Sequence, residues 1–294
     1  MMNNNLVTVD MAARAEKLNN LLLAQEEGFR IEYSRVWKNN RELEGYVLRT
    51  EGSNVAPTVY REDGWYQKSD EEVIRFLKDM LQKHGVASMD VSSYLEKDYV
   101  LSHILPRLVS KSNGAELESR KIAHMPFLDM YILFYVPIED FCDDGVGSIQ
   151  VTEELLKRAD ISIDEAYSAS LSNIEPNAEV KTMQEVLYGE MGISEFAEVP
   201  EIPMYICSVK NRIQGAAVML SRKILDEIES RIGGRAAILP SSIHECIAVP
   251  YNSEEELSTF LSLVKEVNAT QVEPIDKLTD SVYYIEDHQV KLAV

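Results

Sequence analysis

One run of residues, FLDMYILFYVP at positions 127–137, most restricts the fold that this chain can adopt. The run is rich in β-branched and aromatic residues, and both faces of the strand that it would form are hydrophobic. A strand with one face in solvent alternates apolar and polar residues, whereas a strand covered on both faces does not. The run therefore predicts a central, covered strand.

Hairpins that lead into helices recur along the chain. Residues 29–37 and 42–50 alternate apolar and polar side chains around a turn, which predicts a hairpin. The order strand, turn, strand, helix then recurs from residues 130, 204 and 236, either as a repeated ββα unit or as a chance similarity of amphipathic elements. This succession predicts an α+β fold with an antiparallel sheet built from hairpins, and with helices packed mainly on one face.

Several single elements can be placed by the residues that begin, bend or end them. Ser69 and Ser162 are each followed three residues later by a glutamate, which is the pattern of a capped helix start. Residues 98–109 have a helical pattern that Pro106 bends or ends. Residues 215–219 and 243–250 are predicted as the second strands of the later two repeats.

One acidic, proline-bearing segment, residues 193–203, is the best candidate for a linker. It divides the chain into an N-terminal α+β region, residues 1–192, and a C-terminal ββαββα region, residues 203–294. We expect the two regions to pack together as one compact unit. The length is compatible with either one large domain or two of ordinary size.

The chain carries 29 basic and 49 acidic residues, a formal net charge of −20. Such a charge repels phosphate backbones, because nucleic-acid affinity comes largely from Lys and Arg displacing counterions, so direct nucleic-acid binding is not expected. Acidic surfaces also keep cytosolic proteins soluble. Two other interpretations stay open: the acidic surface docks on a basic protein partner, or it mimics a nucleic acid.

The composition favours a cytoplasmic protein without a membrane segment. No stretch of about 18 apolar residues is present to span a bilayer, and the first residues lack the basic and apolar regions of a secretory signal. Cys142, Cys207 and Cys246 are odd in number and widely spaced, which fits a reducing compartment. The oligomeric state leaves no mark on the sequence.

The segment ILPSSIHECIAVP, residues 238–250, holds the densest set of reactive side chains. In a strand, His244 and Cys246 would lie side by side on one face, and Glu245 would point the other way. An imidazole beside a thiol lowers the thiol pKa, so His244, Cys246 and Ser242 are candidate catalytic residues. The structural alternative is a turn whose serine hydroxyls bond the backbone, with His244 hydrogen-bonded beside the sheet.

Asp129 is the fourth candidate, because it lies inside the apolar run. A buried carboxylate without a partner is costly, so we expect an ion pair, for instance with Arg120 or Lys121. A carboxylate in such a setting also suits acid–base catalysis.

No cofactor or metal motif is present in the sequence. The glycine-rich patterns of dinucleotide and phosphate sites are absent. The five histidines lack metal-ligand spacing, and the acidic residues at 139–144 lack calcium-loop spacing, which indicates a solvated turn. We therefore expect no cofactor and no metal site.

Six segments of the chain form a recognisable series: NVAPTVY (54–60), PFLDMYILFYV (126–136), MYICSVKNRIQGAAVML (204–220), ILPSSIHECIAVP (238–250), VKEVNATQV (264–272) and LTDSVYYIED (278–287). In this order they resemble a bacterial family known as domain of unknown function 5688. The resemblance extends from about residue 40 to the end, and the N-terminal helix is expected to be an addition to the family pattern. The C-terminal part is more distantly similar to domain of unknown function 1444. Neither resemblance implies a reaction, cofactor or catalytic residue.

The absence of a convergent catalytic signature favours a non-catalytic binding or protein-interaction protein of the bacterial cytoplasm. The alternative is an enzyme, hydrolase-like, that uses residues around the ILPSSIHE segment. That alternative requires a base and a nucleophile within hydrogen-bond reach in one pocket.

Overall fold

The structure is a computed structural model that describes residues 10–61, 65–85, 89–142, 145–189, 203–240 and 242–293, without the side chains of residues 66, 139–142, 145 and 146. The chain forms two compact units, residues 1–91 and residues 92–294. The first contains 12 basic and 15 acidic residues and the second 17 and 34, so most of the negative charge belongs to the second unit. The strands pair antiparallel in both units, and the fold is α+β, as predicted.

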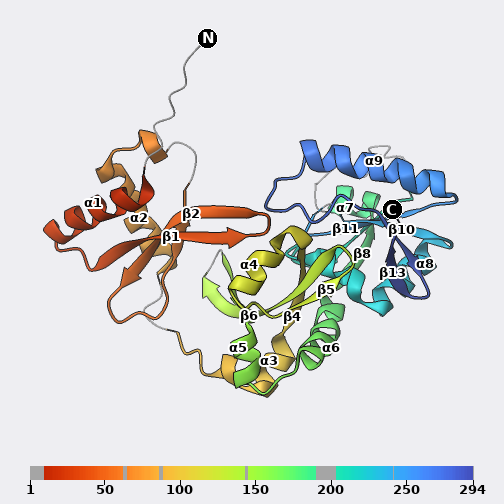
Figure 1. Ribbon diagram of the computed structural model, residues 1–294, viewed down its shortest axis with the longest axis horizontal. Coiled ribbons are helices and arrows are strands. Elements are labelled where there is room, and N and C mark those ends of the chain that lie inside the picture. Colours follow the sequence, from red (N-terminus) through yellow and green to blue (C-terminus); the bar gives the residue numbers. More distant parts are fainter. Residues whose placement is uncertain are drawn as a thin grey trace, which may run out of the picture. The chain divides into compact units, whose positions relative to one another are not determined.

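The described residues of the first unit form a three-stranded antiparallel sheet, two α-helices and a short 3₁₀ helix (Figure 1). The predicted hairpin is present, and the third strand, which follows Pro57, pairs at the edge of the sheet. The elements are α1 (Met11–Ala24), β1 (Phe29–Lys38), β2 (Arg41–Thr50), β3 (Thr58–Tyr60), η1 (Trp65–Gln67) and α2 (Asp70–His84). Apolar residues from both helices and the sheet form its core, with Leu18, Leu48 and Leu77 fully buried.

Arg14 holds α1 against the start of α2. Its Nε lies 2.9 Å from Asp70 Oδ1, and its two terminal nitrogens donate to the carbonyl oxygens of Trp65 and Lys68 at 2.8 and 2.7 Å. All three donor nitrogens of this largely buried guanidinium therefore have acceptors.

The predicted capping box of α2 is present. Glu72 N donates to Ser69 Oγ at 3.2 Å, and Ser69 N donates to Glu72 Oε2 at 2.7 Å. Replacing Ser69 with alanine is expected to lower the free energy of unfolding by about 1 kcal/mol, measured by urea denaturation followed through Trp65 fluorescence. Gln82→Ala on the exposed face of the same helix is the control, and equal effects of the two substitutions would contradict the capping role.

A four-stranded sheet opens the second unit. β6, which contains the apolar run, pairs with β4 on one side and with β5 and β7 on the other, so it is central as predicted. The elements are η2 (Ser93–Leu95), α3 (Lys97–His103), β4 (Leu105–Ser110), η3 (Lys111–Asn113), α4 (Gly114–Ser119), β5 (His124–Phe127), β6 (Met130–Cys142), β7 (Gly145–Gln150), α5 (Glu153–Arg158) and α6 (Ile163–Ile174). The predicted cap at Ser162 is present. The acidic turn at 139–144 lies outside the described side chains.

A six-stranded sheet follows, with the strand order β13-β12-β10-β11-β9-β8. Its elements are η4 (Glu175–Asn177), β8 (Ala178–Thr182), α7 (Met183–Gly189), β9 (Tyr205–Val209), η5 (Gly215–Leu220), α8 (Arg222–Ile232), β10 (Ala236–Leu239), β11 (Cys246–Pro250), α9 (Glu254–Thr270), β12 (Tyr283–Glu286) and β13 (Gln289–Leu292). Because β8 precedes the acidic segment and β9 follows it, the regions 1–192 and 203–294 share this sheet. The linker predicted at 193–203 falls almost entirely outside the described residues.

The two longest helices of this part lie on opposite faces of the sheet (Figure 1). The connections β9–α8–β10 and β11–α9–β12 each cross one strand in the same direction along the sheet. Such crossovers are right-handed in nearly all proteins. Because β9 and β11 run in opposite directions, the same handedness places α8 and α9 on different faces. The helices are thus divided between two faces, whereas the hairpin pattern favoured one.

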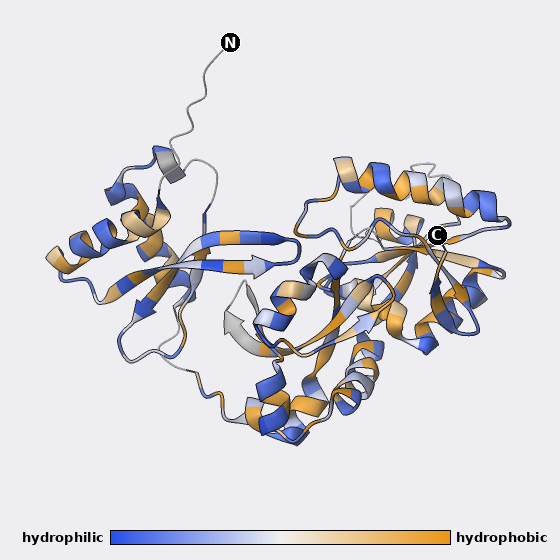
Figure 2. Ribbon diagram, viewed as in Figure 1, coloured by the Kyte–Doolittle hydropathy of each residue, from blue (hydrophilic) through white to orange (hydrophobic). Residues whose placement is uncertain are grey.

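The face under α9 is sealed by apolar side chains. Leu257 and Val264 of the helix pack against Ala237, Leu239 and Val249 of the sheet. Hydrophobic and hydrophilic residues alternate along α9 in Figure 2, as expected for a helix with one buried side.

Two predicted elements are wrong. Residues 98–109 are not one helix, because α3 ends at His103 and the segment with Pro106 forms β4. Pro106 is tolerated there because β4 is an edge strand, where a missing N–H breaks no ladder. Residues 215–219 lie in the buried 3₁₀ helix η5 and not in a strand, so the second ββα repeat does not form.

Among the described residues, no helix is long and apolar enough to cross a membrane.

Candidate functional site

Asp129 is an acceptor for three hydroxyl groups. It occupies the two-residue turn between β5 and β6, where Leu128 has a φ of 53°. Its Oδ2 accepts hydrogen bonds from Thr279 Oγ1 at 2.7 Å and Ser281 Oγ at 2.8 Å, and its Oδ1 accepts one from Tyr283 Oη. The carboxylate therefore joins the two sheets of the second unit. It has partners, as predicted, but they are hydroxyls and not Arg120 or Lys121.

The hydroxyl network determines the charge state of Asp129. Burial raises the pKa of its carboxyl, and the bonds from Tyr283, Thr279 and Ser281 more than offset burial, so its pKa lies below the ordinary value. Burial and the neighbouring carboxylate raise the pKa of the fully buried Tyr283. Asp129 is thus a stable anion whose lone pairs are already engaged, which suits a structural role.

His244 lies before β11 and not in it. Gln214 N donates to its Nδ1 at 3.4 Å, which assigns the ring proton to Nε2, 3.2 Å from Asp276 Oδ1. The His244 carbonyl accepts from Ser208 Oγ at 2.7 Å. Both ring nitrogens of the half-exposed imidazole therefore have partners. Its predicted place on the strand beside Cys246 is wrong, because the chain turns through residues 242–245 and the strand starts only at 246.

The other two candidates of this segment serve the backbone and the core. Ser242 Oγ accepts from His244 N at 3.0 Å, in agreement with the structural alternative. Cys246 is fully buried opposite Cys207. A hydrogen bond with Cys207 and burial raise the pKa of the Cys246 thiol well above its usual value, so it stays protonated at neutral pH. Among the described residues, no hydrogen bond joins any two of the four candidate side chains.

A small cavity lies next to His244, between the four-stranded sheet and the segment that follows β9. Its volume is about 170 Å³. The residues that line it include Leu105, Tyr135, Ile174, Asn177, Lys210 and Gln214. The backbone N–H of Gln214 is the donor to His244, so the cavity and the imidazole share one loop.

The charged and polar groups at this cavity are incompletely paired. Lys210 Nζ donates to the carbonyl of Pro176 at 3.2 Å and forms no ion pair among the described residues. Gln214 Oε1 is buried and has no donor in the described part of the chain. Arg107 does not line the cavity, but it stacks on the lining residue Tyr135, with its guanidinium carbon 4.4 Å from the ring centroid. Its Nη2 lies 3.5 Å from Ser148 Oγ, and its buried Nε has no acceptor among the described residues. The cavity wall thus offers one cationic side chain and one free acceptor.

A larger concave surface of about 770 Å³ lies in the first unit, between α1 and the ends of β1 and β2. Its two arginines, Arg30 and Arg49, both pair with Glu32, and Glu27 pairs with Lys78. Among the described residues, this surface therefore offers no unpaired cation.

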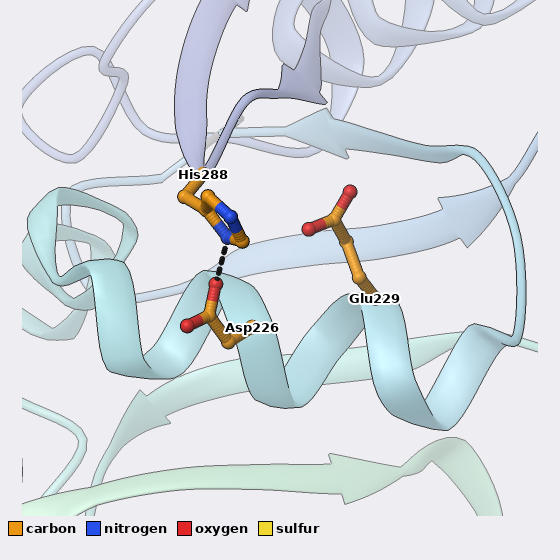
Figure 3. Close-up of side chains that lie close together, drawn as sticks. All are labelled: Asp226, Glu229 and His288. Carbon is orange, nitrogen blue, oxygen red and sulfur yellow. Dashed lines mark hydrogen bonds and ion pairs between the residues drawn. The ribbon is translucent and has the colours of Figure 1, made fainter.

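A group of side chains in the second unit has the carboxylate and imidazole ligands that can bind a metal ion. Asp226 and Glu229 of α8 and His288 of the β12–β13 turn have ligand atoms within 4.8 Å of one another (Figure 3). Sixty-two residues separate Asp226 from His288, so no spacing rule applied to the sequence would have found the group.

The fold and these sites define an antiparallel α+β protein with a small cavity and a surface carboxylate–imidazole group. The chain belongs to the Family of unknown function (DUF5688), whose model matches residues 13–286. The match confirms the resemblance and includes most of α1, so that helix is not an addition to the family pattern. No curated protein and no solved structure matches the chain.

The cavity residues escaped the sequence reasoning because they come from five separate elements. Tyr135 lies within the apolar run, and Leu105 lies in the segment predicted to be helical. The two residues become neighbours only through the pairing of β4 with β6. The sequence therefore holds no local signal for this cavity.

Proposed function

We propose that the protein is a non-catalytic binding protein whose cavity takes a small carboxylate that also carries a hydroxyl or amino group. The observation that carries the proposal is a pair of polar groups on the cavity wall that lack a matching partner. Lys210 forms no ion pair among the described residues, and Gln214 Oε1 accepts no hydrogen bond there. A carboxylate matches the lysine ammonium, and a hydroxyl or amino hydrogen matches the amide oxygen.

Charge supports an anionic ligand. The second unit contains 34 acidic residues, yet none of those described pairs with Arg107 or Lys210. A guanidinium stays protonated even where burial lowers its pKa, as it does for Arg107. Lys210 on the cavity wall, with Arg107 stacked on the wall residue Tyr135, gives this part of an acidic unit a positive charge. Such a charge favours an anion in the cavity over a neutral molecule.

Size restricts the ligand further. A cavity of roughly 150 Å³ in another protein admits benzene, so a cavity of about 170 Å³ encloses a molecule of similar bulk. Small hydroxy acids and amino acids fit this limit, and enclosed nucleotides or peptides do not. Apolar walls from Leu105 and Ile174 suit the hydrocarbon part of such a ligand.

Titration calorimetry with a panel of small hydroxy and amino acids tests the proposal. At least one member is expected to bind the full chain with 1:1 stoichiometry. Lys210→Met and Gln214→Glu are each expected to weaken that binding by about tenfold or more, because a hydrogen bond to a charged group contributes about 1.5–3 kcal/mol.

Lys223→Met on the exposed side of α8 is the matched control and should leave the affinity unchanged. Failure of every panel member to bind, or wild-type affinity in both cavity variants, would contradict the proposal.

A role of the acidic surface in docking on a basic protein, or in mimicking a nucleic acid, stays a prediction. So does the enzyme alternative. An enzyme of that kind needs a base that is hydrogen-bonded to a nucleophile. In the described structure, the His244 imidazole forms no hydrogen bond with Ser242 Oγ or with the Cys246 thiol.

A further inference from the structure

The second unit presents three potential metal ligands from two elements. Asp226 and Glu229 are three residues apart on α8, which places both carboxylates on the same side of the helix. His288 belongs to the tight turn between β12 and β13. Figure 3 shows its imidazole and the two carboxylates directed toward the same space above the helix.

The spacing of the ligand atoms suits one ion. All three lie within 4.8 Å of one another. Nitrogen and oxygen ligands bind a divalent transition metal at roughly 2.0–2.2 Å, so two ligands of one ion lie at most about 4.4 Å apart. Small side-chain rotations are enough to close the difference, because all three residues are exposed or half-buried.

The charges of the group are incompletely balanced. Asp226 Oδ1 lies 2.5 Å from His288 Nδ1. The carboxylate of Glu229 forms no hydrogen bond or ion pair with any described residue, whereas the neighbouring Glu227 pairs with Arg231 at 2.7 Å. Two carboxylates with one imidazole therefore leave negative charge at this place, which a cation would neutralise.

We infer that Asp226, Glu229 and His288 bind a divalent transition-metal ion, with water at the remaining coordination positions. The imidazole decides the class of metal, because it suits zinc and its neighbours, whereas sites made only of oxygen suit Mg²⁺ and Ca²⁺. Zn²⁺ binds more tightly than Mn²⁺ at such a mixed site. This inference is independent of the carboxylate cavity, since the two sites share no residue.

Metal binding would join the β12–β13 hairpin to α8. An ion that binds the folded state and not the unfolded one raises the melting temperature, and the rise grows with its concentration. The protein is therefore expected to melt at a higher temperature in Zn²⁺ than in a chelator, and the difference should disappear when a ligand is removed.

Titration of the untagged full chain with ZnCl₂ alone tests the site. Wild-type protein is expected to bind one Zn²⁺ and to show the rise in melting temperature. Each of three substitutions, His288→Ala, Asp226→Asn and Glu229→Gln, is expected to weaken Zn²⁺ binding by about 10–100-fold or more. Loss of a residue that only hydrogen-bonds to a metal ligand already has an effect of that size. Glu227→Gln, on the same helix but outside the group, should bind as wild type.

Three results would overturn the inference. They are the absence of saturable binding, wild-type affinity in all three ligand variants, and a Ca²⁺ affinity equal to that for Zn²⁺. Circular dichroism of each variant without metal shows whether it is folded, and three independent substitutions keep the test decisive if one of them misfolds.

Discussion

Replacing Gly215 with alanine is expected to destabilise the second unit by about 3 kcal/mol or more. A Cβ at this position would lie 2.1 Å from Ser208 Oγ, 2.5 Å from His244 O and 2.7 Å from Val209 N. Two of these atoms are backbone, and the hydroxyl is fixed by its bond to the His244 carbonyl. None can move without disturbing β9 or the turn before β11.

Urea denaturation followed by circular dichroism measures this effect. Trp37 and Trp65 both lie in residues 1–91, so their fluorescence follows the first unit and gives an internal reference. Gly234→Ala is the matched control in the second unit, because a Cβ there meets no atom within 4 Å. A Gly215→Ala variant as stable as the Gly234→Ala variant would show that the close approach is not real.

Replacing Asp129 with alanine is also expected to cost about 3 kcal/mol, because three hydroxyls lose their shared, charged acceptor. Tyr283 is fully buried and has Asp129 as its main acceptor. The free energy of unfolding at neutral pH measures the loss. Glu266→Ala, which removes an exposed acid of α9 in the same unit, is the control for the change in net charge. Equal stability of the two variants would contradict the bridging role.

The contribution of Asp129 should depend on pH in a known direction. Its pKa is lowered in the folded state, so its stabilising effect is complete above the unfolded pKa of about 3.9 and is lost as the pH falls through the lower, folded value. The difference in stability between wild type and Asp129→Asn is therefore expected to shrink below about pH 4. A difference that grows toward low pH would contradict this assignment.

Much of the fold was open to prediction because local signals agreed with tertiary structure. The β1–β2 hairpin, the caps at Ser69 and Ser162 and the central strand β6 each follow from periodicity or capping chemistry. The errors at Pro106 and at residues 215–219 arose where pairing with distant segments decides the structure. The sequence of η5 predicts a strand. Its small residues instead allow the backbone at Gly215 to approach β9 and His244 closely.

The sites were less predictable than the fold for a physical reason. Ser242, His244 and Cys246 attract attention because they are close in sequence, yet the turn before β11 separates imidazole from thiol. Tyr135, Lys210 and Gln214 meet only through the packing of two sheets, and His288 reaches α8 only through the β12–β13 turn. Proximity that arises from topology leaves no local spacing to detect.

The most direct test of the carboxylate cavity is an NMR titration of the ¹⁵N-labelled full chain with the tightest ligand of the panel. Binding in the cavity predicts saturable amide shifts centred on Asn177, Lys210 and Gln214, with the same titration curve at His244. Shifts that centre on the first unit, or that scatter without saturation, would contradict the account.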